Sequence, residues 1–189
     1  MTNTFLMMQI EGIENAKRIN RDRVVDIILN DTSHFAELIS IAFQTTSKTH
    51  IKAAWILELV CEQQLQLLIP HLDFFAENLK NVSHDSAIRP VSKICNFLAI
   101  AYTSKKDLDF KNLIHKNHIN TIIEVGFDWM IGTTKVATKA YTMNALFLFG
   151  KKHDWVHQEL KLLLEQQIPT ESAAYKARGK ITLALINKK

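Results

Sequence analysis

Apolar residues recur at intervals of three and four along almost the whole chain, which is the spacing of one face of an α-helix. In the stretch from residue 51 to residue 60 the apolar positions form one broad stripe, whereas Lys52, Glu58 and Glu62 fall mostly on other faces. The stripe consists of Ile51, Ala54, Trp55, Leu57, Leu59 and Val60. This pattern predicts helices rather than strands.

The same pattern along the rest of the chain predicts about ten helices joined by short connections. The connections contain mainly Asn, Asp, Ser, Thr, Gly or Pro, and no segment is rich enough in Pro, Gly or Ser to serve as a flexible linker. We therefore expect a single domain over residues 1–189. The expected helices span residues 12–29, 32–45, 49–65, 70–81, 86–103, 107–116, 118–131, 134–150, 153–167 and 171–187.

The large aromatic residues and the glycines predict how these helices pack. Gly126 and Gly150 are expected at tight crossings or helix ends, and Gly150 is typical of a C-terminal cap. Aromatic side chains with apolar neighbours are expected to anchor the core. The expected anchors are Trp55, Phe97, Phe127, Phe147 and Trp155.

The composition favours an all-α fold. The 189 residues include only 5 Gly and 3 Pro, too few for the frequent turns of an all-β protein. The longest apolar runs, such as residues 145–149, are far shorter than the roughly 20 residues of a membrane span. The N-terminal residues lack the features of a secretory signal. Cys61 and Cys95 lie in apolar helical patterns, so we expect reduced, packed thiols in a cytoplasmic protein.

The helical pattern repeats. A block that starts at Lys52 and reaches Arg89 resembles a block from Lys139 to Arg178, and the two starts lie 87 residues apart, which is about two repeats of 43. Basic pairs at i and i+4 recur with them, their first members 41, 46 and 41 residues apart. We call these eight residues the basic ladder: Lys48, Lys52, Arg89, Lys93, Lys135, Lys139, Lys176 and Lys180. The ladder predicts either hydrogen bonding between repeats, with Arg89 also able to pair with Asp85, or an anion-binding edge.

A repeat of this length resembles the HEAT/armadillo-like α-solenoid superfamily, and small residues such as Ala53, Ala54, Ala137 and Ala140 add to the resemblance. It implies a right-handed α-solenoid of four to five helical hairpins. Segments such as residues 53–58, 86–91 and 127–130 are similar to short bacterial helical-repeat proteins of unknown role, some of which carry the automatic name adenylosuccinate lyase. The Ser-rich loop SSxMPxKxNP of that lyase does not occur in this sequence.

Two Asp-Trp dipeptides form a candidate site for a damaged base. Asp128-Trp129 and Asp154-Trp155 combine an acid with an indole, as some HEAT-like DNA glycosylases do, and a cationic base would be attracted to both groups. The alternative interpretation is that both tryptophans are core residues or contacts between repeats.

The string His153-Asp154-Trp155-Val156-His157 places two histidines at i and i+4, a spacing that can bind zinc. The competing interpretation is a helix cap followed by a solvated turn, because the string follows Gly150 and no third ligand stands out. We expect no bound cofactor.

The sequence favours a non-catalytic scaffold that binds a protein or an anionic partner through its repeat surface. The chain lacks a nucleophile elbow and a phosphate-binding glycine loop, so an enzyme is not favoured. A nucleic-acid-binding protein related to alkylation repair is the alternative, because residues 131–189 hold 10 Lys and Arg against 4 Asp and Glu. A lyase-like activity rests only on the automatic name. The oligomeric state stays open, since the terminal helices could cap the array or pair with another copy.

Overall fold

The computed structural model describes residues 4–105 and 108–188. These residues form eleven α-helices and three short 3-10 helices, and no strand occurs within the described ranges, which confirms the all-α prediction. The chain divides into two compact units, residues 1–94 (unit 1) and residues 95–189 (unit 2). Helix α6 (Asp85–Thr103) begins in unit 1 and ends in unit 2.

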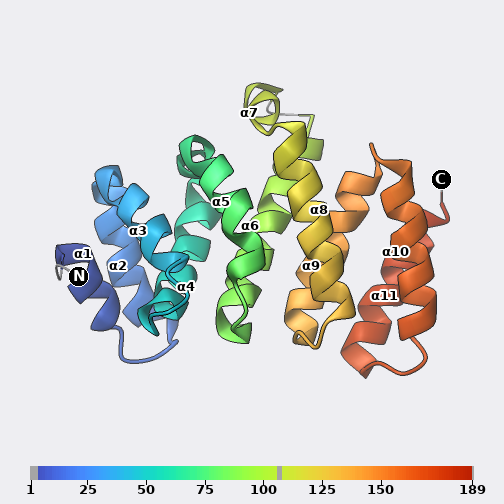
Figure 1. Ribbon diagram of the computed structural model, residues 1–189, viewed down its shortest axis with the longest axis horizontal. Helices are drawn as coiled ribbons and strands as arrows, with labels where there is room; N and C mark the ends of the chain where they lie inside the picture. The colour runs from blue at the N-terminus through green and yellow to red at the C-terminus, as the bar shows by residue number, and fades with distance from the viewer. Residues whose placement is uncertain (1–3, 106–107, 189) are drawn as a thin grey trace. The chain divides into compact units, whose positions relative to one another are not determined.

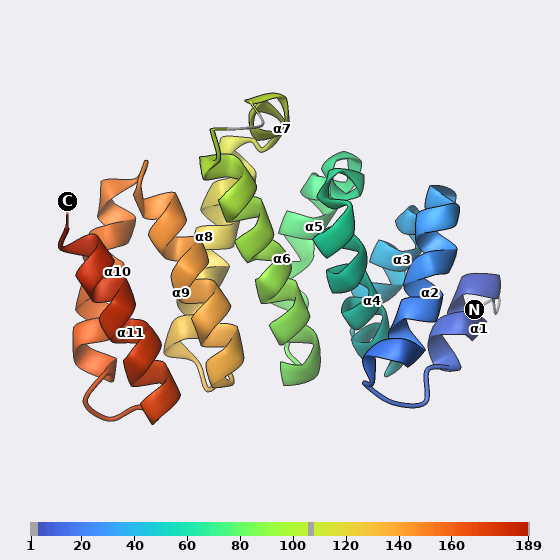
Figure 2. The same ribbon diagram turned by 180° about the vertical axis from the view of Figure 1, so that it is seen from behind.

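Unit 1 is organised around helix α4 (Thr49–Gln63), which packs against α1 (Phe5–Glu11), α2 (Arg18–Asn30) and α3 (Phe35–Ala42). In Figure 1, α3 and α5 (Leu72–Asn78) face the viewer, and α2 and α4 face the viewer in Figure 2. Nine of the fifteen residues of α4 are buried, so this helix forms the core of the unit. The three 3-10 helices, which also lie in this unit, are Thr32–His34, Leu65–His71 and Leu79–Asn81.

Unit 2 has a comparable central helix. Helix α9 (Val136–Gly150) packs against α8 (Lys116–Ile131), α10 (Asp154–Gln167) and α11 (Ala173–Ile186). Helices α8 and α10 face the viewer in Figure 1, whereas α9 and α11 do so in Figure 2. Eight of the fifteen residues of α9 are buried. The short α7 (Leu108–Leu113) precedes α8.

Several predicted boundaries were wrong. Helix α1 was not predicted, and the helix expected from residue 12 begins at Arg18, because the Asn15 side chain holds the preceding residues in a turn by accepting from the Lys17 N–H. The region expected to form one helix over residues 70–81 is instead a 3-10 helix that contains Pro70, followed by the α-helix α5 and by a second 3-10 helix. The expected start at Asp107 lies outside the described residues.

The predicted aromatic anchors are not the most deeply buried side chains, and Trp155 was wrong. Trp155 is 50% exposed, and the other four anchors are only half-buried. The largest fully buried side chains are instead Tyr175, Phe75 and Phe149. In the continuous apolar run of residues 145–149, hydrophobicity alone does not distinguish the inward face from the outward one, and Phe149 rather than Phe147 points inward.

Gly150 marks a close approach of α9 and α10 rather than a left-handed cap, since no described glycine has a positive φ. A Cβ atom on Gly150 would lie 2.0 Å from Cδ2 of His157. The His157 ring stacks on Phe147 at 5.3 Å between centroids, and its Nε2–H donates to the Phe147 carbonyl oxygen over 2.7 Å. Gly126 allows a milder crossing, because its Cβ would lie 3.3 Å from Leu146 Cδ2.

The first prediction concerns this contact. Gly150→Ala is expected to lower the free energy of unfolding by about 1–3 kcal/mol, because the new methyl group overlaps the His157 ring and the well-packed core cannot move away freely. Urea denaturation measures the loss.

The control is the same change in a His157→Ala background. There the overlap is removed, so Gly150→Ala is expected to cost almost nothing, which gives a strong coupling in the double-mutant cycle. Equal losses in both backgrounds would contradict the overlap.

Candidate binding surfaces

In unit 1 the basic ladder is tied to a buried carboxylate. Glu58 of α4 is only 3% exposed, and it accepts from Arg89 over 3.3 Å and from Lys93 Nζ over 2.9 Å. Lys93 also contacts Glu62 at 3.0 Å. Burial alone would lower the pKa of Lys93, but its hydrogen bonds to Glu58 and Glu62 outweigh burial and raise this pKa. Arg89 thus forms its ion pair with Glu58 and not with Asp85, which precedes it by four residues in the sequence.

In unit 2 Lys139 of α9 has a similar structural role. It is 5% exposed, its Nζ lies 2.9 Å from Glu171 Oε1, and it lies 5.5 Å from the centre of the Tyr175 ring. The hydrogen bond from Lys139 lowers the pKa of Glu171.

A fourth ladder residue, Lys52 of unit 1, also binds the chain itself, because its Nζ donates to the Glu11 carbonyl oxygen over 2.8 Å. Four of the eight ladder residues therefore bind groups of the chain itself.

The other four ladder residues are less buried than Lys139. Lys48 and Lys135 are exposed at the N-cap positions of α4 and α9. Lys176 is half-buried and Lys180 is exposed, both on α11.

Lys152, which follows α9 and is not a ladder residue, has its Nζ 4.4 Å from the centre of the Tyr102 ring. The neighbouring Lys111 and, to a smaller extent, desolvation lower the pKa of Lys152 to about 8.

The structure separates the members of the Asp-Trp candidate. Trp129 is 6% exposed and belongs to the core, whereas Asp128 on the same helix is exposed. Trp155 is exposed at the start of α10 and pairs with Phe127 of α8 at 6.1 Å between ring centroids. Asp154 lies beside it in the first turn of α10.

The two histidines of the zinc candidate have different environments. His153 is the N-cap residue of α10, and its side chain makes no capping bond. His157 is buried, and its Nε2 is bonded to a backbone carbonyl. Within the described part of the chain no three His, Cys, Asp or Glu residues come together as metal ligands. Cys61 and Cys95 are free and buried, and burial raises the pKa of both thiols.

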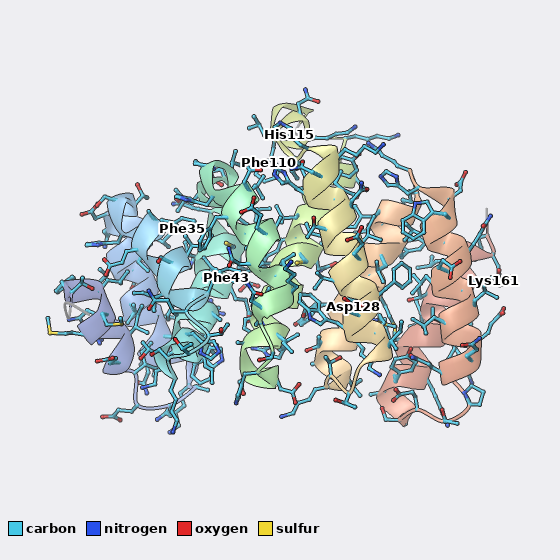
Figure 3. All side chains as sticks on the ribbon, in the orientation of Figure 1. Phe35, Phe43, Phe110, His115, Asp128 and Lys161 are labelled. Atoms are coloured by element: carbon cyan, nitrogen blue, oxygen red, sulfur yellow. The ribbon has the colours of Figure 1, made fainter. Side chains whose placement is uncertain are left out.

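One surface groove of unit 2 was not predicted. A groove of about 180 Å³ lies between α8 and α10, and Phe127, Ile131 and Leu162 line it together with Leu163, Glu159 and Gln166. Ile131 is 67% exposed and Leu162 53% exposed. Glu159 is an exposed acid of its lining, and α8, which supplies Phe127 and Ile131, also carries the exposed acids Glu124 and Asp128. Figure 3 shows Asp128 on α8, while Lys161, which pairs with Glu165 at 3.9 Å, lies on the side of α10 away from α8.

A signal for this groove is present in the sequence. Helix α10 carries two apolar stripes, because Val156, Leu160 and Leu164 are buried while Trp155 and Leu162, seven residues apart, are exposed. A single-sided surface helix needs only one stripe. The second stripe therefore indicates a surface available for contact with another molecule.

None of the helices in the described ranges has both the length and the apolar character needed to cross a membrane. No protein-family model, no curated protein and no solved structure matches this chain. The family resemblance therefore stays a prediction.

The second prediction tests the division of the basic ladder. Lys139→Ala is expected to lower the free energy of unfolding by about 1–3 kcal/mol, because it removes a buried ion pair and the contact with Tyr175. The matched control is Lys135→Ala, one turn earlier in the same region, which is expected to change it by less than about 0.5 kcal/mol. Chemical denaturation measures both.

The pH dependence gives a second readout of the same pair. Because Glu171 has a lowered pKa in the folded protein, its contribution is present above the usual value of 4.5 and is lost as the pH falls through the folded value. Lys139→Ala should therefore flatten the acid limb of a plot of Tm against pH. An unchanged acid limb would contradict this assignment.

Proposed function

We propose that this chain is a non-catalytic, protein-binding scaffold of the HEAT/armadillo-like α-solenoid type, and that the groove between α8 and α10 is its docking site. The exposed apolar surface of the groove carries the proposal. Within each unit, a central helix packed against its neighbours and short connections support the repeat interpretation. An intracellular location, predicted from the two reduced cysteines, belongs to the same proposal.

The groove has the composition of a protein interface. Leu162 and Ile131 in its lining, and Trp155 beside the lining residue Phe127, are each at least half exposed, although they are large apolar residues. Such residues gather where a partner will cover them, and tryptophan in particular often supplies much of the binding free energy. The Phe127–Trp155 pair places a ready-made aromatic anchor beside the groove.

The charge around the groove indicates the kind of partner. Glu159 belongs to its lining, and the exposed acids Asp128 and Glu124 lie on α8, next to and one turn before the lining residue Phe127 in the sequence. A groove between two helices suits an amphipathic helix with apolar residues at i, i+3, i+4 and i+7. An acidic border favours Lys and Arg on the edges of that helix. We therefore infer that the partner offers an amphipathic helix with basic flanks.

The third prediction uses two labelled synthetic helices that share one leucine stripe but differ in having lysine or glutamate flanks. The lysine-flanked peptide is expected to bind and the glutamate-flanked one is not, because only the first complements the acidic border. The double variant Trp155→Ala/Leu162→Ala should lower the affinity for the lysine-flanked peptide by about tenfold or more, as measured by fluorescence anisotropy.

The matched control is Ile181→Ala/Leu185→Ala on α11, which removes apolar residues that are 54% and 42% exposed outside the groove. This variant should leave affinity unchanged. Equal binding of both peptides, or equal loss in both variants, would contradict the proposal. Light scattering on the same samples establishes whether a second copy of the chain occupies the groove instead.

Nucleic-acid binding is the second candidate, supported by the accessible ladder residues Lys135, Lys176 and Lys180 in unit 2. The fourth prediction states what this function requires. Labelled single- and double-stranded oligonucleotides should bind with an affinity that falls steeply as salt rises, and Lys135→Glu/Lys176→Glu/Lys180→Glu should abolish binding. Lys139 is left unchanged, because its loss would disturb the fold. The absence of binding at low salt would exclude this candidate.

A further inference from the structure

Helix α11 carries a second apolar stripe, on the side that faces away from its own unit. Its inner side packs against α9 and α10. The outer stripe includes Ile181, which is 54% exposed, and Leu185, which is 42% exposed. A surface helix needs only one apolar stripe to hold it in the fold, so this second one indicates cover by another molecule. The exposed apolar positions, at i, i+4, i+7 and i+8, are Ala177, Ile181, Ala184 and Leu185.

Basic side chains border this outer stripe of α11. At about 100° per residue, Arg178 and Lys180 fall on opposite sides of Ile181 around the helix axis, and both are exposed. The sequence of α11 contains no Asp or Glu, and Glu171, which precedes the helix, is bound by Lys139. The outer side of α11 is therefore an amphipathic surface with basic flanks. These are the properties that the groove between α8 and α10 requires of a partner helix.

Charge distinguishes between the surfaces that could cover the stripe. A second α11 would bring Arg178 and Lys180 against the same cations, so a symmetric pairing of two stripes is disfavoured. The groove of unit 2 offers the opposite charge, since Glu159 belongs to its lining and α8 also carries the exposed acids Glu124 and Asp128. The exposed apolar part of that lining matches the apolar stripe. The groove is thus the complementary surface in both charge and polarity.

The α11 stripe of a chain cannot fill the groove of the same chain. Within unit 2, α8 and α10 face the viewer in Figure 1, whereas α11 does so in Figure 2, after a half-turn. Because the inner side of α11 is packed against α9 and α10, its exposed stripe points away from both. Between two copies the lengths agree, since α10 and α11 each have 14 residues and are about 21 Å long.

We propose that α11 of one copy docks, through Ile181 and Leu185, into the groove between α8 and α10 of a second copy of this chain. The inference rests on the proposed docking site and names the helix that occupies it. Arg178 and Lys180 then lie beside the acids of α8 and α10. The contact joins two different surfaces, so every pair of copies keeps one free groove and one free stripe, and further copies can add head to tail.

The fifth prediction concerns the mass of the intact protein in solution. One helix in one groove is a small interface, so association is expected to be weak and to grow between about 1 µM and 1 mM protein. Sedimentation velocity should show an average mass that rises past that of a dimer. The rise should be smaller at high salt, which screens the contacts between acids and bases. A mass of one copy at every concentration would overturn the inference.

Two double variants test the two surfaces separately. Trp155→Ala/Leu162→Ala damages the groove and leaves α11 intact, and Ile181→Ala/Leu185→Ala does the reverse. Each variant alone should associate at least about tenfold more weakly than the native chain. An equimolar mixture should form dimers and nothing larger, because each pair has one intact groove and one intact stripe. Recovery in the mixture also shows that both variants are folded, and a mixture no better than the single variants would overturn the head-to-tail contact.

The matched control is Phe5→Ala/Met8→Ala on α1, which removes two large apolar residues that are 51% and 49% exposed in unit 1. This variant should associate as the native chain does, because neither residue belongs to the groove or to the α11 stripe. An equal loss of association in this control would show general attraction between apolar surfaces and would overturn the inference.

This inference and the proposed docking site fail separately. In dilute solution the copies are apart, so Ile181→Ala/Leu185→Ala leaves the affinity for the lysine-flanked peptide unchanged while it weakens self-association. An excess of that peptide should dissociate the assembly, because both compete for the groove. A chain that binds the peptide but stays monomeric at high concentration would keep the docking site and overturn α11 as its occupant.

Discussion

The burial of one central helix in each unit is the constraint on which the rest of the structure depends. Helices α4 and α9 have neighbours along most of their surface, so any polar group that they carry needs a partner inside the fold. Glu58 on α4 is met by Arg89 and Lys93, and Lys139 on α9 is met by Glu171. The burial of the central helices therefore determines which ladder residues have structural roles and which remain available to bind a partner.

Much of the secondary structure follows from local sequence, and the errors have identifiable causes. The spacing of apolar residues predicts most helices, including α6 with Pro90 inside it. The helix expected from residue 12 was placed too early because periodicity cannot detect the turn that the Asn15 side chain makes. Phe147 was expected to be the anchor in place of Phe149, because α9 carries apolar residues on every side and its pattern gives no direction to its large side chains.

The candidate sites were harder to predict than the helices, because they depend on residues far apart in the sequence. The spacing of the basic ladder is visible in the sequence. The carboxylate that binds Arg89 and Lys93, however, is Glu58, about thirty residues earlier, and no local sequence pattern identifies Glu58 as their partner. A recess beside the start of α4 brings residues 45–48, 50 and 51 together with Ser83 and His84 in the same way. The second apolar stripe of α10 was readable, but only its neighbour α8 turns that stripe into a groove.

The two native cysteines have a practical consequence for experiments on this chain. A thiol reacts through its thiolate, and burial of Cys61 and Cys95 keeps both in the protonated form. Maleimide dyes, spin labels or cross-linkers should therefore react with a cysteine introduced on the surface and leave the thiols of Cys61 and Cys95 unmodified. Site-directed labelling of the folded protein then needs no cysteine-free background, and distances within each unit become measurable in the native sequence context.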